Sequence, residues 1–235
     1  MSFIANIKDT KLYSDEVFGH LKYLTDSDKE LMRDNSVCLH FRSGETVYRE
    51  GEKPTGLVCL VEGKVKVFKE GFAGRDWIAR MVKPVEMVGY RALFAEENYN
   101  ASAQTIENSV IFIIDRDILL EILRRNPDLT LNFMKILAKE LGFVNCRTIT
   151  LTQKHIRGRL AETLLFLRDN YGYEDNEKML KIYLSREEIA NLSNMTASNA
   201  IRTLSAFNAE ELIELKGRKI ILKDEVQLEK ISRLG

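Results

Sequence analysis

Apolar residues in the range 36–115 fall in short alternating runs, and turns that contain Gly or Pro interrupt these runs roughly every ten residues. This pattern is typical of a β-sandwich or barrel, and we expect a jelly roll. The clearest predicted hairpin places Gly63 between strands over 57–62 and 65–69. The continuous apolar run 109–114 predicts a buried strand.

Helical spacing flanks this sandwich. Two helices are predicted before it, over 12–23 and 26–33, and a third opens at Asp115 and ends near Pro127. A longer helix then starts at Pro127, where the missing amide removes no helical hydrogen bond, and continues to Gln153. One stripe on this helix recurs in alternating steps of four and three: Thr130, Met134, Leu137, Leu141, Val144, Thr148 and Leu151. Held over about three heptads, this period predicts a two-stranded coiled coil and therefore a homodimer; the alternative is a helix packed on its own barrel.

Residues 184–219 predict two short helices joined by a tight turn. Ser185 and Glu188 form a capping-box pattern that begins the first helix, and a polar turn over 193–195 precedes a second helix that starts at Thr196. The second helix is predicted to bury Ala200, Ile201, Leu204 and Phe207. Its outward residues are then Ala197, Ser198, Asn199, Arg202 and Ser205. A small, polar and basic face of this kind suits the major groove of DNA, whereas an ordinary helical hairpin inside a core is the alternative.

A basic hairpin is predicted directly after these helices. Alternating apolar positions over 211–215 and 219–223 indicate two strands, and the turn Lys216-Gly217-Arg218 carries two cations. Cations at a hairpin tip beside a recognition helix are placed to meet backbone phosphates, so the module is interpreted as a winged helix-turn-helix. A polar loop over 169–178 and a short strand over 180–184 are expected before it.

The fold class expected from these elements is α+β, with three parts along the chain. They are a sandwich domain with its helices over 1–126, a dimerisation helix over 127–153, and a winged helix-turn-helix domain over 154–235. At 235 residues and 45% hydrophobic content, the chain is long enough for two cores.

Charge and cysteine content change this picture little. Lys plus Arg and Asp plus Glu both number 35, so the whole chain has no basic bias, although 154–159 and 216–219 each hold three cations and no acid. No apolar run is long enough to span a membrane and the N-terminus lacks a signal-peptide core, so we expect a cytoplasmic protein without a membrane partner. Cys38, Cys59 and Cys146 are widely spaced and are expected to be buried, reduced thiols.

Several motifs carry a resemblance to a known family. They are Gly44-Glu45, Arg49-Glu50-Gly51-Glu52, the run LVEGKVKV over 60–67 and Gly89, followed by the winged helix-turn-helix. In this order, over nearly the whole chain, they resemble the cyclic-AMP receptor protein/FNR (Crp/Fnr) family of bacterial regulators. The resemblance implies a cyclic-nucleotide-binding-type jelly roll that senses a signal, a dimer helix, and a C-terminal domain that binds palindromic promoter DNA. It also implies RNA polymerase as a partner.

The effector site departs from the cyclic-AMP-binding members of that family. Their phosphate cassette uses G-E-L-x-L and then R-S or R-T, because a cyclic phosphate needs a guanidinium and free amides while the glutamate holds the ribose. Here Tyr90 stands in the glutamate place, and Asn100 and Ala101 replace the arginine and its hydroxyl neighbour. Positions that contact adenine in the family correspond to Val144 and Asn145, without paired hydroxyls. The candidate effector pocket comprises Gly89, Tyr90, Arg91, Asn100, Ala101, Ser102, Val144 and Asn145.

The effector itself stays unknown at this point, and the residues argue against cyclic AMP. Arg91 is a candidate relocated anion ligand, although an arginine beside Glu96-Glu97 more often forms a surface ion pair. An iron–sulfur cluster is disfavoured because no clustered cysteines precede Cys38. Haem ligation through His20, His40 or a cysteine is kept as an alternative.

The predicted function is a homodimeric, sequence-specific transcription regulator. Ala197, Ser198 and Arg202 are expected to face bases, and only Arg202 matches the R-E-x-x-x-R pattern of the cyclic-AMP receptor protein. The residues expected to hold phosphates are Ser185, Thr196, Asn199, Lys216, Arg218 and Lys219. An alternative is a ligand-binding module that acts through a protein partner. An enzyme is not expected, because the chain lacks GxSxG, HExxH and phosphate-loop motifs.

Overall fold

The computed structural model describes residues 3–4, 7–71, 76–174 and 178–235. The chain forms two compact units, each described by itself. The N-terminal unit comprises residues 1–69 and 79–141, and the C-terminal unit comprises residues 70–78 and 142–235. The fold class is α+β, as the sequence predicts.

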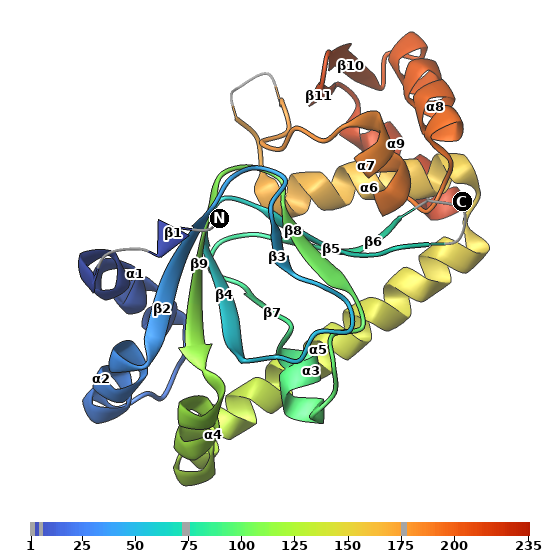
Figure 1. Ribbon diagram of the computed structural model, residues 1–235. Helices are drawn as coiled ribbons and strands as arrows, with labels where there is room; N and C mark the ends of the chain where they lie inside the picture. Colours follow the sequence, from blue (N-terminus) through green and yellow to red (C-terminus); the bar gives the residue numbers. More distant parts are fainter. Residues whose placement is uncertain (1–2, 5–6, 72–75, 175–177) are drawn as a thin grey trace. The chain divides into compact units, whose positions relative to one another are not determined.

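Two antiparallel sheets form the core of the N-terminal unit (Figure 1). The five-stranded sheet has the order β1-β2-β9-β4-β7 and the four-stranded sheet the order β3-β8-β5-β6. Their strands are β1 (Phe3–Ile4), β2 (Ser36–Phe41), β3 (Thr46–Tyr48), β4 (Gly56–Glu62), β5 (Val65–Lys69), β6 (Trp77–Val82), β7 (Met87–Val88), β8 (Ser102–Thr105) and β9 (Ser109–Asp115). This two-sheet arrangement confirms the predicted jelly roll.

The strands β4 and β9 are apolar at nearly every position because both of their faces are covered. On β4, Leu57 and Cys59 join the core that the helices cover, whereas Val58 and Leu60 join the core enclosed with the second sheet. On β9, Phe112 packs into the first of these cores. The buried strand predicted over 109–114 is therefore confirmed, in the centre of its sheet.

The predicted hairpin around Gly63 is wrong. Both strands exist, but β4 pairs with β9 and β7 while β5 pairs with β8, in the other sheet. Gly63 has a φ of +88°, and a Cβ there would lie 2.5 Å from the carbonyl oxygen of Asn108. Glycine is required because the chain turns tightly from one sheet to the other.

Helices α1 (Ile7–His20), α2 (Asp26–Asp34), α3 (Tyr90–Ala95) and α4 (Arg116–Arg125) complete this unit. Both α2 and α4 begin with the side-chain caps that their sequences indicate. Thr25 and Asp28 form a capping box on α2, and Asp115 accepts hydrogen bonds from the main-chain amides of Asp117 and Ile118 on α4. The helices predicted over 12–23, over 26–33 and from Asp115 are confirmed, although α1 begins earlier and ends at His20.

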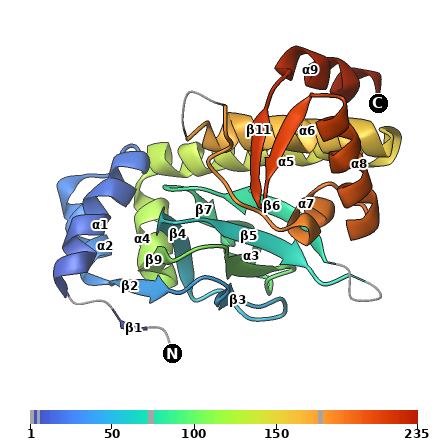
Figure 2. The ribbon, with the colours of Figure 1, turned by 90° about the horizontal axis from the view of Figure 1, so that it is seen from above.

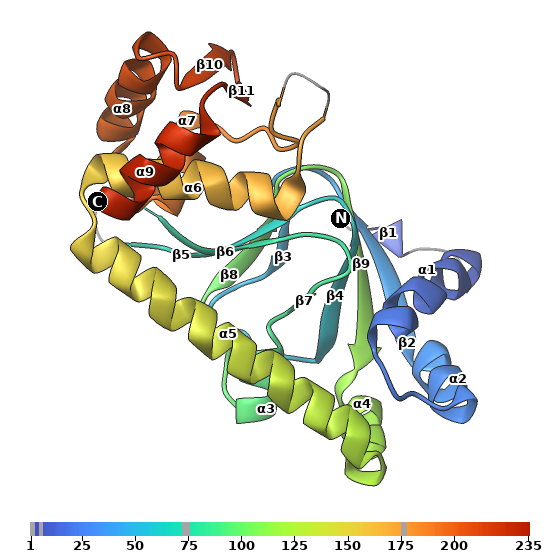
Figure 3. The ribbon, with the colours of Figure 1, turned by 180° about the vertical axis from the view of Figure 1, so that it is seen from behind.

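The long helix α5 runs from Pro127 to Gln153 as one element (Figure 3). Its first turns pack into the helix-covered core through Leu129 and Phe133, which are 0% and 3% exposed. Beyond these turns the apolar stripe is exposed, at 60% for Met134 and 63% for Leu141. The long-helix prediction is confirmed, whereas the division of the chain at 126 and 153 stays a prediction.

The C-terminal unit contains α6 (Ile156–Tyr171), α7 (Arg186–Leu192), α8 (Ala197–Ala209), α9 (Glu225–Leu234) and the hairpin β10 (Ile213–Lys216) with β11 (Lys219–Leu222). The hairpin lies beside α8 (Figure 2). The strand predicted over 180–184 is wrong, because only isolated bridges form there, at Met179 and Leu180. Part of the polar loop predicted over 169–178 lies outside the described residues.

The cysteine prediction is correct at two positions of three. Cys38 and Cys59 are buried in the helix-covered core, and burial raises the pKa of the Cys59 thiol to about 12. Cys146 is exposed. Cys146 lies in a stretch of α5, residues 141–146, in which every residue is exposed.

Candidate nucleic-acid interface and an internal polar cluster

Side-chain caps set the start of each helix in the predicted DNA-reading pair. Ser185 Oγ accepts a hydrogen bond from the Glu188 amide at 3.1 Å, and the Ser185 amide donates to Glu188 Oε2 at 2.8 Å. Thr196 Oγ1 caps α8 by accepting from the Asn199 amide at 3.2 Å. Between the helices, Asn194 has a φ of +49°, a conformation that asparagine tolerates better than most residues. The helix-turn-helix prediction is confirmed down to its caps.

The outward face of α8 is small, polar and basic, with one correction. Ala197, Ser198 and Arg202 are exposed, and Arg202 Nη2 donates to Asn199 Oδ1 at 2.8 Å. Ile201, which the sequence pattern placed in the core, is 49% exposed, and Thr203 is buried instead. A helical step of about 100° per residue explains this, because Ala200 already occupies the inward direction and Ile201 turns beyond it.

The wing is a tight hairpin whose tip carries three exposed cations, Lys216, Arg218 and Lys219. Lys216 pairs with Lys219 across the strands, so the turn itself is Gly217-Arg218, and Gly217 has a φ of +63°. Sequence reasoning missed Arg186, whose Nη2 donates to the Gly217 carbonyl at 2.7 Å and so ties the wing tip to the start of α7. The local signal was a cation at the first position of a capped helix.

The wing cations keep local partners. Lys216 Nζ lies 3.1 Å from Glu214, and Lys219 Nζ lies 5.3 Å from the centre of the Tyr183 ring. Two of the three cations over 154–159 also have carboxylate partners. Lys154 pairs with Glu162, and Arg157 makes a bidentate ion pair with Glu210, at 2.8 and 2.6 Å. The three wing cations are all exposed and therefore present positive charge to solvent.

A second set of polar side chains lies inside the N-terminal unit, around Gly89. Tyr48 and Tyr99 stack with ring centroids 3.8 Å apart, and both are 7% exposed. A Cβ on Gly89 would lie 2.5 Å from Tyr99 Cε1. Burial and the nearby Glu52 raise the pKa of Tyr99 to about 12, so its ring stays a neutral phenol.

An ion pair between the second sheet and α5 continues this cluster. Arg80 Nη1 lies 3.0 Å from Glu140 Oε1, and Arg80 Nη2 lies 3.5 Å from Glu86 Oε2. The Tyr90 hydroxyl donates to the other oxygen of Glu140, and Tyr90 is 3% exposed. Burial by itself would lower the pKa of Arg80, but Glu140, Tyr90 and Glu86 raise it by a larger amount. The pKa of Arg80 is therefore above its usual value, and Arg80 stays charged. Sequence reasoning missed Arg80 and Glu140.

Comparison with known proteins identifies both halves of the chain. Residues 38–126 match the family model of the cyclic nucleotide-binding domain, and residues 158–231 match that of the Crp-like helix-turn-helix domain. The chain belongs to the Crp/Fnr family of bacterial transcription regulators. The C-terminal geometry described above is therefore the sequence-specific DNA-binding module of a Crp/Fnr regulator.

Three relatives illustrate the match. The chain is 27% identical over 194 residues to a CRP-like cAMP-activated global transcriptional regulator of Mycobacterium tuberculosis, covering 82% of this chain and 87% of that one. It is 26% identical over 196 residues to the anaerobic regulatory protein of Bacillus subtilis, covering 82% of each. The structure of FixK2 from Bradyrhizobium japonicum superposes with a TM-score of 0.75 at 21% identity, over 83% of this chain and 96% of that one. The last likeness shows the shared fold.

Not all residues that the Crp/Fnr resemblance assigned to an effector pocket lie together. Gly89 and Tyr90 contribute to the internal cluster, but Arg91 is exposed and pairs with Glu97 at 2.8 Å, as the surface alternative for it predicts. Ser102 is buried and its Oγ accepts from the Glu50 amide at 2.9 Å. The remaining candidates are Asn100, Ala101, Val144 and Asn145. Asn100 is exposed, and its carbonyl accepts a hydrogen bond from Lys69. Val144 and Asn145 are exposed on the part of α5 that belongs to the C-terminal unit.

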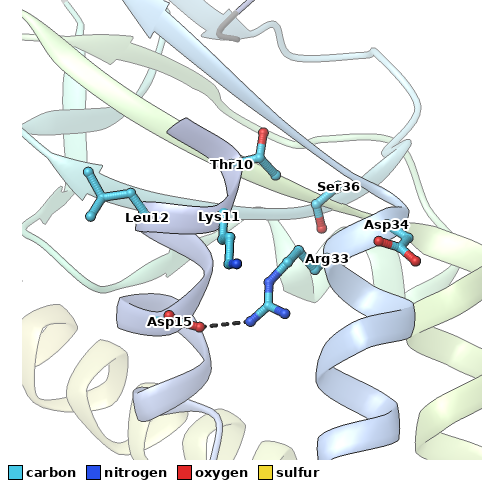
Figure 4. Close-up of a pocket in the computed structure, with 7 residues that line it drawn as sticks. All are labelled: Thr10, Lys11, Leu12, Asp15, Arg33, Asp34 and Ser36. Carbon is cyan, nitrogen blue, oxygen red and sulfur yellow. Dashed lines mark hydrogen bonds and ion pairs between the residues drawn. The ribbon is translucent and has the colours of Figure 1, made fainter. Parts of the chain in front are cut away.

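A hollow of about 800 Å³ lies between α1 and α2 of this Crp/Fnr chain (Figure 4). Its cation Arg33 donates to Asp15 at 2.8 Å and to Ser14 Oγ at 2.9 Å. Lys11 and Asp34 also line it, so its charges balance. The hollow gives no reason to expect a charged ligand.

Among the helices of the described residues, none is long and apolar enough to cross a membrane. Within the same residues, no group of His, Cys, Asp and Glu is arranged to hold a metal ion. His20 and His40, the candidate haem ligands, are both exposed.

Proposed function

We propose that the regulator binds palindromic DNA as a homodimer, with α8 in the major groove and the wing on the adjacent phosphates. The observation that carries this proposal is the exposed face of α8 beside the three cations of the wing. A helix with small residues at its exposed start can approach base edges closely, and paired modules reach half-sites about one helical turn, ~34 Å, apart.

Arg202 is the principal base-reading residue in this proposal. Its guanidinium is exposed, and the hydrogen bond to Asn199 holds it against α8, so less side-chain entropy is lost when it meets a guanine. Ile201 adds an apolar group on the same face, which suits contact with a thymine methyl. Ala197 and Ser198 leave room for the bases, and their difference from the R-E pattern implies a different operator.

Phosphate contacts are assigned to the wing and to the helix caps. Lys216, Arg218 and Lys219 supply charge at the wing tip. Thr196 and Ser185 keep their hydroxyl protons for a phosphate oxygen, since each cap uses its side-chain oxygen as an acceptor. Asn199 shares its Oδ1 with Arg202, and its amide nitrogen still has protons to donate.

Dimerisation is assigned to α5. Three members of the predicted seam, Met134, Leu141 and Val144, are 60%, 63% and 48% exposed, so a large apolar stripe faces solvent in the isolated chain. Exposed apolar stripes of this length mark interaction surfaces, and the heptad spacing fits a second copy of the same helix.

The effector of this protein is proposed to be a molecule other than cyclic AMP. The relative from Mycobacterium tuberculosis is cAMP-activated. In this chain, however, Arg80 is already neutralised by Glu140 and Glu86, and the tyrosines fill the space around Gly89. A cyclic phosphate would lack a free cation there. Calorimetric titration with cyclic AMP tests this, and saturable micromolar binding would reject it.

The decisive experiment on DNA binding is a selection from random duplexes followed by fluorescence anisotropy. Arg202→Ala should lose about 1–3 kcal/mol of discrimination at one base pair of each half-site, because a bidentate base contact disappears. Lys216→Ala is the matched control, since it should weaken all duplexes alike and reduce the salt dependence. Equal losses for Arg202→Ala on the selected and scrambled duplexes would reject the base-reading role.

The same titrations separate a second candidate, a module that acts only through a protein partner. The exposed side chains on α5 and α8 would then serve protein contacts. Affinity that falls steeply with salt supports DNA binding, whereas failure to select any duplex favours the partner. Contact with RNA polymerase, which the family resemblance implies, can be assayed separately by transcription from the selected site.

A further inference from the structure

A cavity of about 250 Å³ in the C-terminal unit has chemistry that DNA binding does not use. It lies where the last turns of α5 meet α6 and the end of α7. Two arginines and two phenylalanines are among its lining residues, and those on which the argument depends are Phe143, Cys146, Arg147, Arg159, Glu162 and Phe166. All of them belong to one compact unit.

The two arginines have buried donors without an acceptor. The Nε atoms of Arg147 and Arg159 are inaccessible to solvent and have no hydrogen-bond partner within the described part of the chain. Arg147 Nη2 donates to the carbonyls of Leu192 at 2.8 Å and Ile78 at 3.0 Å. Arg159 Nη1 makes only a long contact, 3.4 Å, with the carbonyl of Leu151. Buried N–H groups are almost always paired in folded proteins, so two orphans on one cavity point to an acceptor that the chain itself does not provide.

The charge in this cavity is also unbalanced. Its one carboxylate, Glu162, is held by Lys154 Nζ and by the Thr150 hydroxyl at 3.0 Å. The three acceptors of the arginine Nη groups are neutral carbonyls, so two guanidinium charges face the cavity without a carboxylate in salt-bridge range among the described residues. Burial lowers the pKa of Arg147, which Glu162 only partly offsets, as expected for a cation without a counter-ion.

We propose that this cavity is a binding site for a small organic anion. Its carboxylate or phosphate oxygens accept hydrogen bonds from the guanidinium groups of Arg147 and Arg159 that line the cavity. Its carbon skeleton packs against Phe143 and Phe166, whose ring centroids are 6.0 Å apart. The volume of about 250 Å³ is that of about eight waters at ~30 Å³ each, which is space for a compact anion such as a phosphorylated three-carbon acid or a small polycarboxylic acid.

Occupancy of this site is linked to the DNA-binding module through its walls. The cavity is bounded by α5, α6 and α7 together, so a ligand that contacts all three favours one arrangement of these helices over others. Since α7 is the first helix of the helix-turn-helix, the anion acts as an effector of DNA binding. This consequence rests on the proposed mode of DNA binding, whereas the existence of the site does not.

Cys146 allows the site to be tested without DNA. It lines the cavity and is exposed, while Cys38 and Cys59 are buried, so alkylation by N-ethylmaleimide, a neutral reagent, reports on this position. The probes are citrate and pyrophosphate at constant ionic strength, with chloride as the reference. We expect at least one of these two anions to slow alkylation of Cys146 in the full-length protein until the effect saturates. Half of the maximal protection should be reached at an anion concentration below ~1 mM.

Arginine variants separate this site from nonspecific anion binding. Arg159→Gln should raise the half-protection concentration about tenfold, and Arg147→Gln should do the same. Arg159→Gln carries the test if Arg147→Gln unfolds, because Arg147 also supports Leu192. Arg233→Gln is the matched control, since that side chain is 82% exposed on α9, and it should change nothing.

Two results would overturn the proposal: protection that is equal in all variants, or absence of saturation up to ~10 mM for both probes. Calorimetry with the same probes must rank the affinities of the variants in the same order as the protection experiment. DNA anisotropy of each variant without anion is measured in parallel. Anion binding without any DNA binding would reject the DNA proposal alone, whereas normal DNA binding without anion protection would reject the site alone.

Discussion

Removal of the charge on Glu140 provides a direct test of the internal polar cluster. Glu140→Gln keeps an oxygen that accepts from Tyr90, but it removes the anion that faces Arg80 at 3.0 Å. Arg80 then retains only Glu86, at 3.5 Å. The variant therefore leaves a largely buried guanidinium with half of its counter-charge.

The expected loss of stability follows from distance and burial. Two unit charges about 4 Å apart attract by about 4 kcal/mol at an effective dielectric constant of about 20. The side chains of Arg80 and Glu140 are 27% and 31% exposed, so water screens part of this attraction. With that screening and the remaining carboxylate, we expect Glu140→Gln to lower the free energy of unfolding by about 2 kcal/mol, below the 3–5 kcal/mol typical of a fully buried broken pair.

Urea unfolding followed by circular dichroism measures this loss. The matched control is Glu97→Gln, which breaks the Arg91–Glu97 pair at 2.8 Å, where the side chains are 44% and 60% exposed. That change should alter stability by less than about 0.5 kcal/mol, because exposed pairs contribute little. Equal, small losses in both variants would show that solvent reaches Arg80 and would refute the closed cluster.

Three further predictions concern the dimer, the helix-turn-helix and the thiols. Leu141→Lys should convert the dimer into monomers, which light scattering would detect as a halved mass. Ile149→Lys, at an exposed position of the same helix outside the seam, should leave the mass unchanged. The reverse result would reject the heptad assignment. Ser185→Ala removes the cap of α7 and should destabilise the C-terminal unit by about 1 kcal/mol in thermal unfolding, and no change would contradict the cap. At pH 8 Cys146 should react with N-ethylmaleimide while Cys59, whose burial raises its pKa to about 12, should react only after unfolding; mass spectrometry of the native protein decides this.

Local sequence patterns were sufficient for the elements that depend on neighbouring residues. The cap predicted at Ser185 and the helix starts predicted at Thr196 and Asp115 are correct, because each of these side chains accepts a hydrogen bond from a main-chain amide only two or three residues away. The long helix from Pro127 and the buried strand over 109–114 were also predictable, since period and continuous apolarity are visible along the chain. Errors appear where a pattern has two solutions, as at Ile201, whose place on α8 differs from the core by one helical step.

The internal cluster could not be predicted in the same way. Arg80 and Glu140 are 60 positions apart, and each is an ordinary charged residue in its own segment. Likewise, no local signal shows that the chain leaves one sheet for the other at Gly63, because a hairpin and a crossing use the same glycine. The orphan donors of Arg147 and Arg159 become visible only when α5, α6 and α7 enclose them.

Short-range physics thus accounts for the helices, most strands, the DNA-reading face and the family of this regulator. These features depend on periodicity, capping and turn chemistry within a few residues, and all three can be recognised in the amino-acid sequence. Strand partners, the neutralised arginine beside Tyr90 and the anion cavity depend on long-range packing. Packing brings distant charges into a low-dielectric interior, where each must find a partner, and that pairing exists only in three dimensions.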